Sequence, residues 1–153
     1  LTAGLKAAET GHLVFATLHS TDVQQTITRM LDITPQEERH MIRQSLVGAL
    51  KVVICQRLLP TIRDDVPRVP ALEIMIANAS VRKLIAEERE VDIPTVIRSC
   101  YNEGMIDYTE SLRLLIDRDF IDVKTAMNFA PNQEELRMAL KGIRSSAGGL
   151  TGS

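Results

Sequence analysis

The segment Gly11–Ser20 constrains the fold of this 153-residue chain more than any other. Its central part, Leu13–Leu18, is an almost wholly apolar run with β-forming residues, which is typical of a central strand in a parallel sheet. A strand this buried needs cover on both faces, so the run predicts an α/β fold. Ligands of open α/β sheets bind beyond the carboxyl ends of the strands, and His19, Ser20 and Thr21 follow that end here.

His12 lies at the opposite end of the predicted strand. Seven residue steps of about 3.3 Å each separate His12 from His19 by roughly 23 Å along a straight strand, so we expect them to belong to different sites. The residues alone leave two roles open for each histidine. His19 is a satisfied loop side chain or a functional group, and His12 is a capping or packing residue or a functional group.

The net charge of -2 and the two cysteines exclude several classes of protein. Phosphate-backbone binding needs clustered Lys and Arg, so nucleic acid is not an expected partner. No apolar run approaches the ~20 residues of a membrane helix and no secretory signal is present, so we expect a soluble, cytoplasmic protein. Cys55 and Cys100 lie in apolar stretches, which predicts buried reduced thiols, and their spacing from the histidines predicts no metal site.

Periodicity predicts the elements that follow the first strand. A strand at Lys51–Leu59 pairs with one at Val69–Ile76 across a polar turn, and no strand signal follows Ala77. Helices are expected at 2–8, 23–31, from 35 to 50, and then as a string of short helices at 81–85, 93–101, 107–120, 123–130 and 132–143.

Several segments carry a family resemblance when taken together. They are Ala8–His19, Thr28–Ile33, Pro35–Arg39, Val53–Pro60 and Pro70–Ile76. In this order they resemble the secretion-superfamily ATPases, the hexameric motors of type II secretion and type IV pili. Ser80–Ile85 is also similar to the Ala-Ile-Arg-Asn-Leu-Ile motif of the PilT-type retraction motors.

The phosphate-binding motif Gly-x-x-x-x-Gly-Lys-Ser/Thr is absent from the chain, which begins with Leu1. The resemblance therefore implies the carboxyl-terminal portion of a motor ATPase, cut just after its acidic Walker B strand. It implies that most ligands of ATP and Mg²⁺ lie upstream, with an amino-terminal domain. We expect the chain by itself to be inactive.

The resemblance implies three parts. Residues 1–77 are expected to be the carboxyl-terminal half of a RecA-like P-loop ATPase core, from the histidine box to the last strands. Residues 78–144 are expected to form a small all-helical domain, and the Gly/Ser-rich residues 145–153 a flexible tail. Assembly and secretion motors usually carry a four-cysteine zinc subdomain after the Arg-Leu-Leu-Pro strand, whereas Thr61–Pro70 predicts only a short hairpin here, which favours a retraction-type motor.

The resemblance also implies roles for the candidate site residues. His19 is expected to bind nucleotide and act in catalysis by reaching the terminal phosphate or the attacking water, since a neutral imidazole is a suitable hydrogen-bond partner. The family marks His12 as well, and its action on nucleotide, on a neighbouring subunit or only on the strand stays open.

The arginines are expected at contact surfaces. Arginine fingers of the family lie upstream, so inter-subunit contacts are the role expected of four of them, against the alternative of solvated helix faces. These are Arg29, Arg39, Arg43 and Arg57. Arg82 is expected to hold its charged head in solvent as an output surface, while Leu84 and Ile85 are core.

The function implied is that of a homo-hexameric ATP-hydrolysing motor that drives type IV pilus retraction, known as twitching motility. Its expected partners are inner-membrane pilus platform proteins, reached from the cytoplasm without membrane insertion. The alternatives are a type II secretion or pilus assembly ATPase of the same superfamily, or a non-catalytic helical adaptor.

Overall fold

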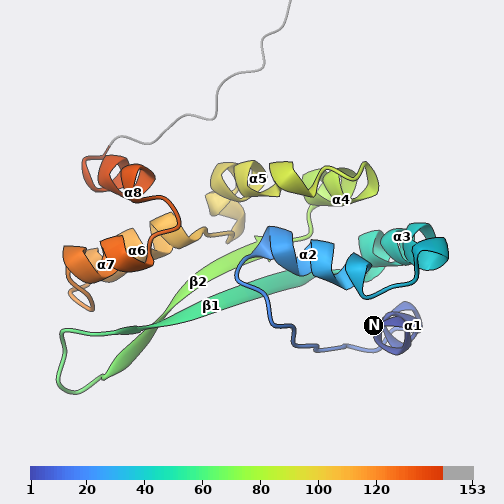
Figure 1. Ribbon diagram of the computed structural model, residues 1–153, viewed down its shortest axis with the longest axis horizontal. Coiled ribbons are helices and arrows are strands. Elements are labelled where there is room, and N and C mark those ends of the chain that lie inside the picture. Colours follow the sequence, from blue (N-terminus) through green and yellow to red (C-terminus); the bar gives the residue numbers. More distant parts are fainter. Residues whose placement is uncertain (143–153) are drawn as a thin grey trace, which may run out of the picture. The chain divides into compact units, whose positions relative to one another are not determined.

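A computed structural model of the protein describes residues 1–142, and its fold is α/β (Figure 1). The hairpin strands are β1 (Val52–Pro60) and β2 (Arg68–Ile76). The helices are α1 (Thr2–Glu9), α2 (Val23–Asp32), α3 (Arg39–Ala49), α4 (Ala79–Ala86), α5 (Ile93–Ser99), α6 (Tyr108–Asp117), α7 (Val123–Phe129) and α8 (Gln133–Leu140). Short 3₁₀ turns are η1 (Gln36–Glu38), η2 (Glu90–Asp92) and η3 (Tyr101–Glu103).

The chain divides into two compact units. Unit 1 contains Leu1–Cys55 and Ile74–Met105, and unit 2 contains Gln56–Glu73 with the residues from Ile106 on. The division crosses the hairpin, so each strand contributes residues to both units. The domain boundary expected near Ala77 follows a different criterion, the end of strand signals, and stays a prediction.

Unit 1 is built around α2 and α3. The helix α3 packs against α1, α2 and α4, and α2 also packs against α5. Asp22 begins α2 because its side chain accepts a 2.8 Å hydrogen bond from the Gln25 backbone, which satisfies a donor that the first helical turn leaves free. The core consists of apolar side chains at helical spacing: Val23, Ile27, Leu46, Val81, Ile85, Ile93 and Ile97.

The hairpin follows the alternation of its sequence. Ala77 donates to the carbonyl of Lys51 and Thr61 donates to that of Pro67, so the two strands are antiparallel. The residues buried on them alternate with exposed ones, as expected when one face of a sheet is covered. Buried positions are Val53, Cys55, Leu59, Val69, Ala71, Glu73 and Met75.

Unit 2 packs α6 against α7 and α8. The side chains of Asp107, Asp122 and Asn132 cap the three helices by accepting hydrogen bonds from backbone N–H groups of their first turns. Leu112, Ala126 and Leu136 form its core. The hairpin turn joins this unit through Ile62, whose backbone donates to the Phe120 carbonyl, and through Arg63, which stacks over the Phe120 ring at 4.1 Å.

Most of the predicted elements are confirmed, with shifted ends. The predicted helix at 93–101 stops at Ser99, and Tyr101–Glu103 forms a 3₁₀ turn that Gly104 ends with a positive φ of 91°. The start of the helix expected from Pro35 is likewise a 3₁₀ turn, and α3 begins only at Arg39. Ile143 and the tail at 145–153 lie outside the described residues.

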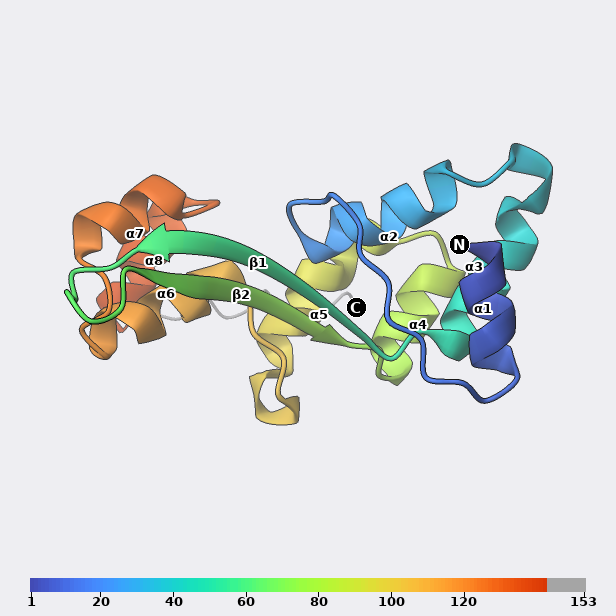
Figure 2. The same ribbon diagram turned by 90° about the horizontal axis from the view of Figure 1, so that it is seen from below.

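The prediction that Leu13–Leu18 forms a buried strand is wrong for the described residues. The segment runs extended without strand pairing, as Figure 2 shows, and Leu13 and Phe15 are 80% and 89% exposed. A strand needs a neighbour for its backbone N–H and C=O groups, and the two strands within residues 1–142 pair only with each other. Among the helices of the same residues, none is long and apolar enough to cross a membrane.

Candidate functional site

The His19 corner, residues His19 to Asp22, joins the extended segment to α2. The guanidinium of Arg29 donates a hydrogen bond to the His19 backbone carbonyl. Ser20 Oγ and Thr26 Oγ1 share a 2.7 Å hydrogen bond. The corner is therefore attached to α2 by two side chains of that helix, while the His19 imidazole itself is exposed.

Thr26 connects this corner to the core of unit 1. Its hydroxyl donates to the Asp22 carbonyl at 2.7 Å and lies 3.5 Å from Cys55 Sγ on β1. Thr26 and Cys55 are both buried, and Cys55 is a free thiol as predicted. The hydroxyl of Thr26 thus has partners on both sides, which removes the cost of burying it.

His12 lies in a different setting. Its Nδ1 is 3.1 Å from Thr10 Oγ1 and 3.3 Å from the Ala7 carbonyl, beside the carboxyl end of α1. Within residues 1–142, His12 and His19 share no hydrogen-bond partner. This geometry matches the capping role that the sequence left open for His12, and a catalytic role for it stays a prediction.

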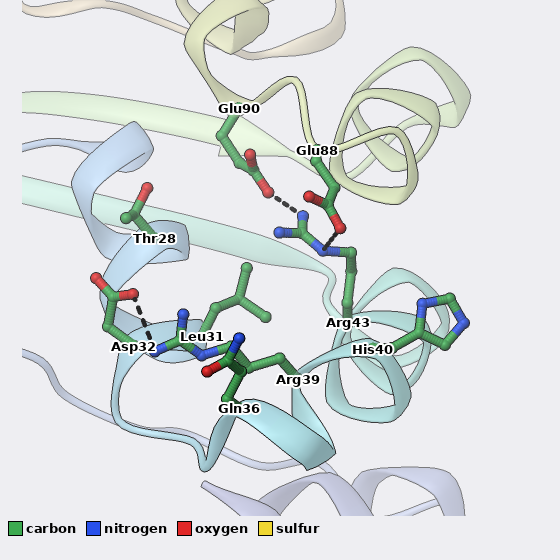
Figure 3. A pocket seen from close by; sticks show the side chains of 9 residues that line it. All are labelled: Thr28, Leu31, Asp32, Gln36, Arg39, His40, Arg43, Glu88 and Glu90. Carbon is green, nitrogen blue, oxygen red and sulfur yellow. Dashed lines mark hydrogen bonds and ion pairs between the residues drawn. The ribbon is translucent and has the colours of Figure 1, made fainter.

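A charged hollow of about 340 Å³ lies between α2, α3 and the turn after α4 (Figure 3). Arg43 on its wall donates to the Glu90 carboxylate and to the Ile85 carbonyl at 2.6 Å, and its Nε lies 3.7 Å from Glu88. Arg43 and Glu90 are only 12% and 13% exposed, so this pair is nearly buried. The lining consists of Thr28, Leu31, Asp32, Gln36, Arg39, His40, Arg43, Glu88 and Glu90.

Arg39 stands on the same helix in a more open position. Its guanidinium lies 3.6 Å from Asp32, and its Nε donates to the Thr34 carbonyl at 3.3 Å. The side chains of Arg39 and Asp32 are 45% and 60% exposed, so their attraction is screened by water. Arg39 and Arg43 are one helical turn apart on α3, and they have different electrostatic settings.

Arg57 belongs to unit 2, where it is part of the packing. Its guanidinium stacks over the Tyr108 ring at 4.2 Å and donates to the Phe129 carbonyl at 3.2 Å. A guanidinium stacked on a ring gains a cation–π attraction in addition to its hydrogen bonds. Tyr108 and Phe129 are both in the same chain as Arg57, so these contacts do not test the expected role of Arg57 at a subunit contact, which stays a prediction.

The expectation that the head of Arg82 reaches into solvent is wrong. The guanidinium donates to the backbone carbonyls of Val47, Gly48 and Leu50, at 3.3 Å for Gly48 and 2.9 Å for Leu50. These carbonyls lie at the carboxyl end of α3, where the last carbonyls of a helix have no N–H group of the next turn to bind. Leu84 and Ile85 are buried, as predicted.

Sequence reasoning did not identify the partners of these arginines. Glu90 lies 47 residues from Arg43, and no local pattern connects the two. The only sequence signal for the Thr26–Ser20 hydrogen bond is the run of capping residues at positions 20–22, just before α2. Within residues 1–142, no three His, Cys, Asp or Glu side chains gather into a site for a metal ion.

Comparison with known proteins identifies the family. The sequence profile described as Type II/IV secretion system protein matches residues 1–108. The chain belongs to this Type II/IV secretion family. It is 41% identical over 132 residues to the twitching motility protein of Neisseria gonorrhoeae, across 86% of this chain and 35% of that protein. It is 39% identical over 122 residues to the type IV pilus retractation ATPase PilT of Pseudomonas aeruginosa, across 80% of this chain and 35% of PilT.

A solved structure of a Type II/IV secretion relative has the same fold. The crystal structure of the pilus retraction motor PilT with bound ADP superposes with a TM-score of 0.77 at 34% identity, over 89% of this chain and 37% of that one. The chain spans about a third of the length of the relatives it matches. The family profile ends at Tyr108, so it covers every candidate residue from His12 to Arg82 and leaves α7 and α8 outside.

Proposed function

We propose that this chain is the carboxyl-terminal part of an ATP-hydrolysing motor that drives type IV pilus retraction. The observation that carries the proposal is the fold similarity to the retraction motor PilT over 89% of the chain. The crystallised PilT binds ADP. By this proposal the full-length protein binds ATP and Mg²⁺ through residues that are mostly outside this chain, and it works as a hexamer.

The exposed apolar segment supports the same proposal. Leu13 and Phe15 expose side chains that a folded protein normally covers, and the backbone between His12 and Ser20 has strand-like extension without a neighbour. A sheet supplied by the rest of the ATPase core would cover both. We propose that Leu13–Leu18 becomes the central strand there, with His19 at its carboxyl end next to bound nucleotide.

The proposed partners, the location and the roles of the two parts of the chain follow from a function as a retraction motor. A retraction motor acts on pilus platform proteins at the inner membrane, and we propose these as its partners, with the protein on the cytoplasmic side. Residues 1–77 are then part of the ATPase core, and the helices after Ala77 transmit its motion. The exposed face of α3 near Arg39 is proposed to contact a neighbouring subunit.

The test is His19→Ala in the full-length protein. A group that meets the terminal phosphate mainly in the transition state lowers kcat when removed, while nucleotide affinity changes little. We expect kcat to fall about 100-fold, within the range for a positioned acid–base or hydrogen-bonding side chain. ATP turnover and nucleotide Kd are measured side by side.

His40→Ala is the matched control, because His40 is also exposed and its ring points away from the ion pairs of the hollow (Figure 3). Normal turnover in the His19 variant would show that His19 is an ordinary loop residue. A full-length protein without any ATP hydrolysis would instead favour the adaptor hypothesis.

A further inference from the structure

We propose that Arg29 is a positioning residue for His19: through its bond to the His19 carbonyl it holds the imidazole in place for the nucleotide. The inference rests on the proposed function, because it assigns Arg29 a part in the same site. It replaces the inter-subunit contact expected for Arg29 with a role inside its own chain. The bond from the Arg29 guanidinium to the His19 carbonyl oxygen is the observation behind it.

The main chain of His19 has little other support. Within residues 1–142, no backbone-to-backbone hydrogen bond involves residues 13 to 20. The side-chain hydrogen bonds that reach His19 and Ser20 from α2 are those of Arg29 and Thr26. A loop with so few bonds moves freely unless such contacts restrain it.

The two anchors act on neighbouring residues in different ways. Thr26 holds the side chain of Ser20, whereas Arg29 holds the main chain of His19. A fixed carbonyl restricts the peptide plane after His19 and so narrows the directions open to its side chain. Positioning of this kind matters for rate, since a displacement of about 1 Å at a reacting group lowers turnover by as much as 100-fold.

Arg29 differs from Arg39 and Arg43 in its electrostatic setting. Arg39 and Arg43 each have carboxylate partners, whereas within the described residues no carboxylate lies within ion-pair distance of Arg29. Its partner is the neutral carbonyl of His19, on an exposed loop. Within residues 1–142, Arg29 therefore forms no ion pair that would attach α2 to another element. Its hydrogen bond goes to His19.

The first experiment is a double-mutant cycle in the full-length protein, with Arg29→Ala, His19→Ala and the two combined. Arg29→Ala is expected to lower kcat at least tenfold with nucleotide Kd within about twofold of the parent. In the His19→Ala background, the same change is expected to lower kcat by less than about twofold, because the group that Arg29 positions is gone. Arg98→Ala, an exposed arginine on α5, is the matched control and should leave kcat unchanged.

The cycle separates failure of this inference from failure of the proposed function. If His19→Ala turns over normally, the proposed function falls and the inference falls with it. If His19→Ala is slow but Arg29→Ala is normal, or if the two losses add fully, only the inference is overturned. A loss of turnover in Arg29→Ala that comes with a matching loss of melting temperature also overturns it, since that is a folding defect.

The second experiment needs no activity and also uses the full-length protein. Hydrogen–deuterium exchange of the amides from Leu18 to Thr21 is expected to be at least tenfold faster in Arg29→Ala, with the amides of α3 unchanged. Arg98→Ala should leave both regions unchanged. Equal exchange at the His19 corner in the parent and the Arg29 variant would overturn the positioning role.

Discussion

The guanidinium of Arg82 donates a 2.9 Å hydrogen bond to the backbone carbonyl of Leu50, the residue that follows α3. It also donates to Val47 and Gly48, so one side chain of α4 satisfies three carbonyls at the end of another helix. Cations near a helix carboxyl end also interact favourably with the helix dipole. Arg82 is therefore a structural connection between α3 and α4.

We expect Arg82→Ala to lower the free energy of unfolding by about 1.5–3 kcal/mol, the range for hydrogen bonds that involve a charged group. Urea denaturation of this chain measures the change. Lys83→Ala is the control, because within residues 1–142 the Lys83 side chain makes only an exposed ion pair with Glu87, so its removal should change stability by at most about 0.5 kcal/mol. Equal denaturation midpoints for the two variants would contradict the structural role of Arg82.

The Arg43–Glu90 pair gives a second prediction. Both side chains are nearly buried, and removal of one partner leaves the other charge without compensation, so Arg43→Ala should destabilise the chain by about 3 kcal/mol. Arg39→Ala removes a partner from the exposed pair with Asp32 and should cost about 0–1 kcal/mol. The urea denaturation midpoints of the two variants measure the difference. Similar losses of stability would contradict the prediction that the buried pair contributes more than the exposed pair.

We expect this chain alone to hydrolyse no ATP, because it contains no phosphate-binding loop. A phosphate-release assay with the purified chain, ATP and Mg²⁺ measures this against a buffer blank. The full-length protein under the same conditions is the positive control. Hydrolysis by the chain that rises in proportion to its concentration and survives further purification would contradict the expectation.

Asp122 predicts a pH dependence of stability. Its carboxylate accepts a hydrogen bond from the Thr125 side chain and one from the Thr125 backbone, and these bonds lower the pKa of Asp122 below its ordinary value of 3.8. A lowered pKa means that the stabilisation is complete above the unfolded-state pKa and is lost as the pH falls through the folded-state pKa. The parent chain should therefore exceed Asp122→Ala in stability at pH 7, and the difference should shrink below pH ~4.

Urea titrations of both proteins at several pH values between about 2.5 and 7 test this prediction. Asp117→Ala is a comparison, since Asp117 lies at the end of α6 and caps no amino terminus. A difference between the parent and Asp122→Ala that stays constant down to the lowest pH would contradict the capping role of the ionised carboxylate.

The helices and the hairpin were predictable because their signals are local. Asp107 precedes Glu110 by three residues, and the structure has the Glu110 backbone donating to the Asp107 carboxylate at 2.8 Å. Asn132 caps α8 in the same way. The β1 alternation of Val53, Cys55 and Leu59 with exposed neighbours likewise depends only on the two-residue repeat of a strand.

The site was predictable only in part. His19 was selected because it follows a strand signal, and the structure does place it in a loop before a capped helix. The same signal failed for Leu13–Leu18. An apolar run predicts that a segment will be buried, but it does not identify the neighbouring strand that would bind the segment's backbone N–H and C=O groups. The partners of Arg29, Arg43 and Arg82 were also missed, since they lie 10 to 47 residues away along the chain.

The sequence by itself determined the family, the order of the helices, the hairpin and the caps, because each depends on residue types at short, fixed spacings. Only the tertiary structure decided what the arginines do. A guanidinium reaches several ångströms from its backbone and binds any carbonyl or carboxylate that packing brings near. Arg82 therefore caps α3 instead of facing solvent, and Arg29 holds His19, because the folding of α2, α3 and α4 against their neighbours put those acceptors within reach.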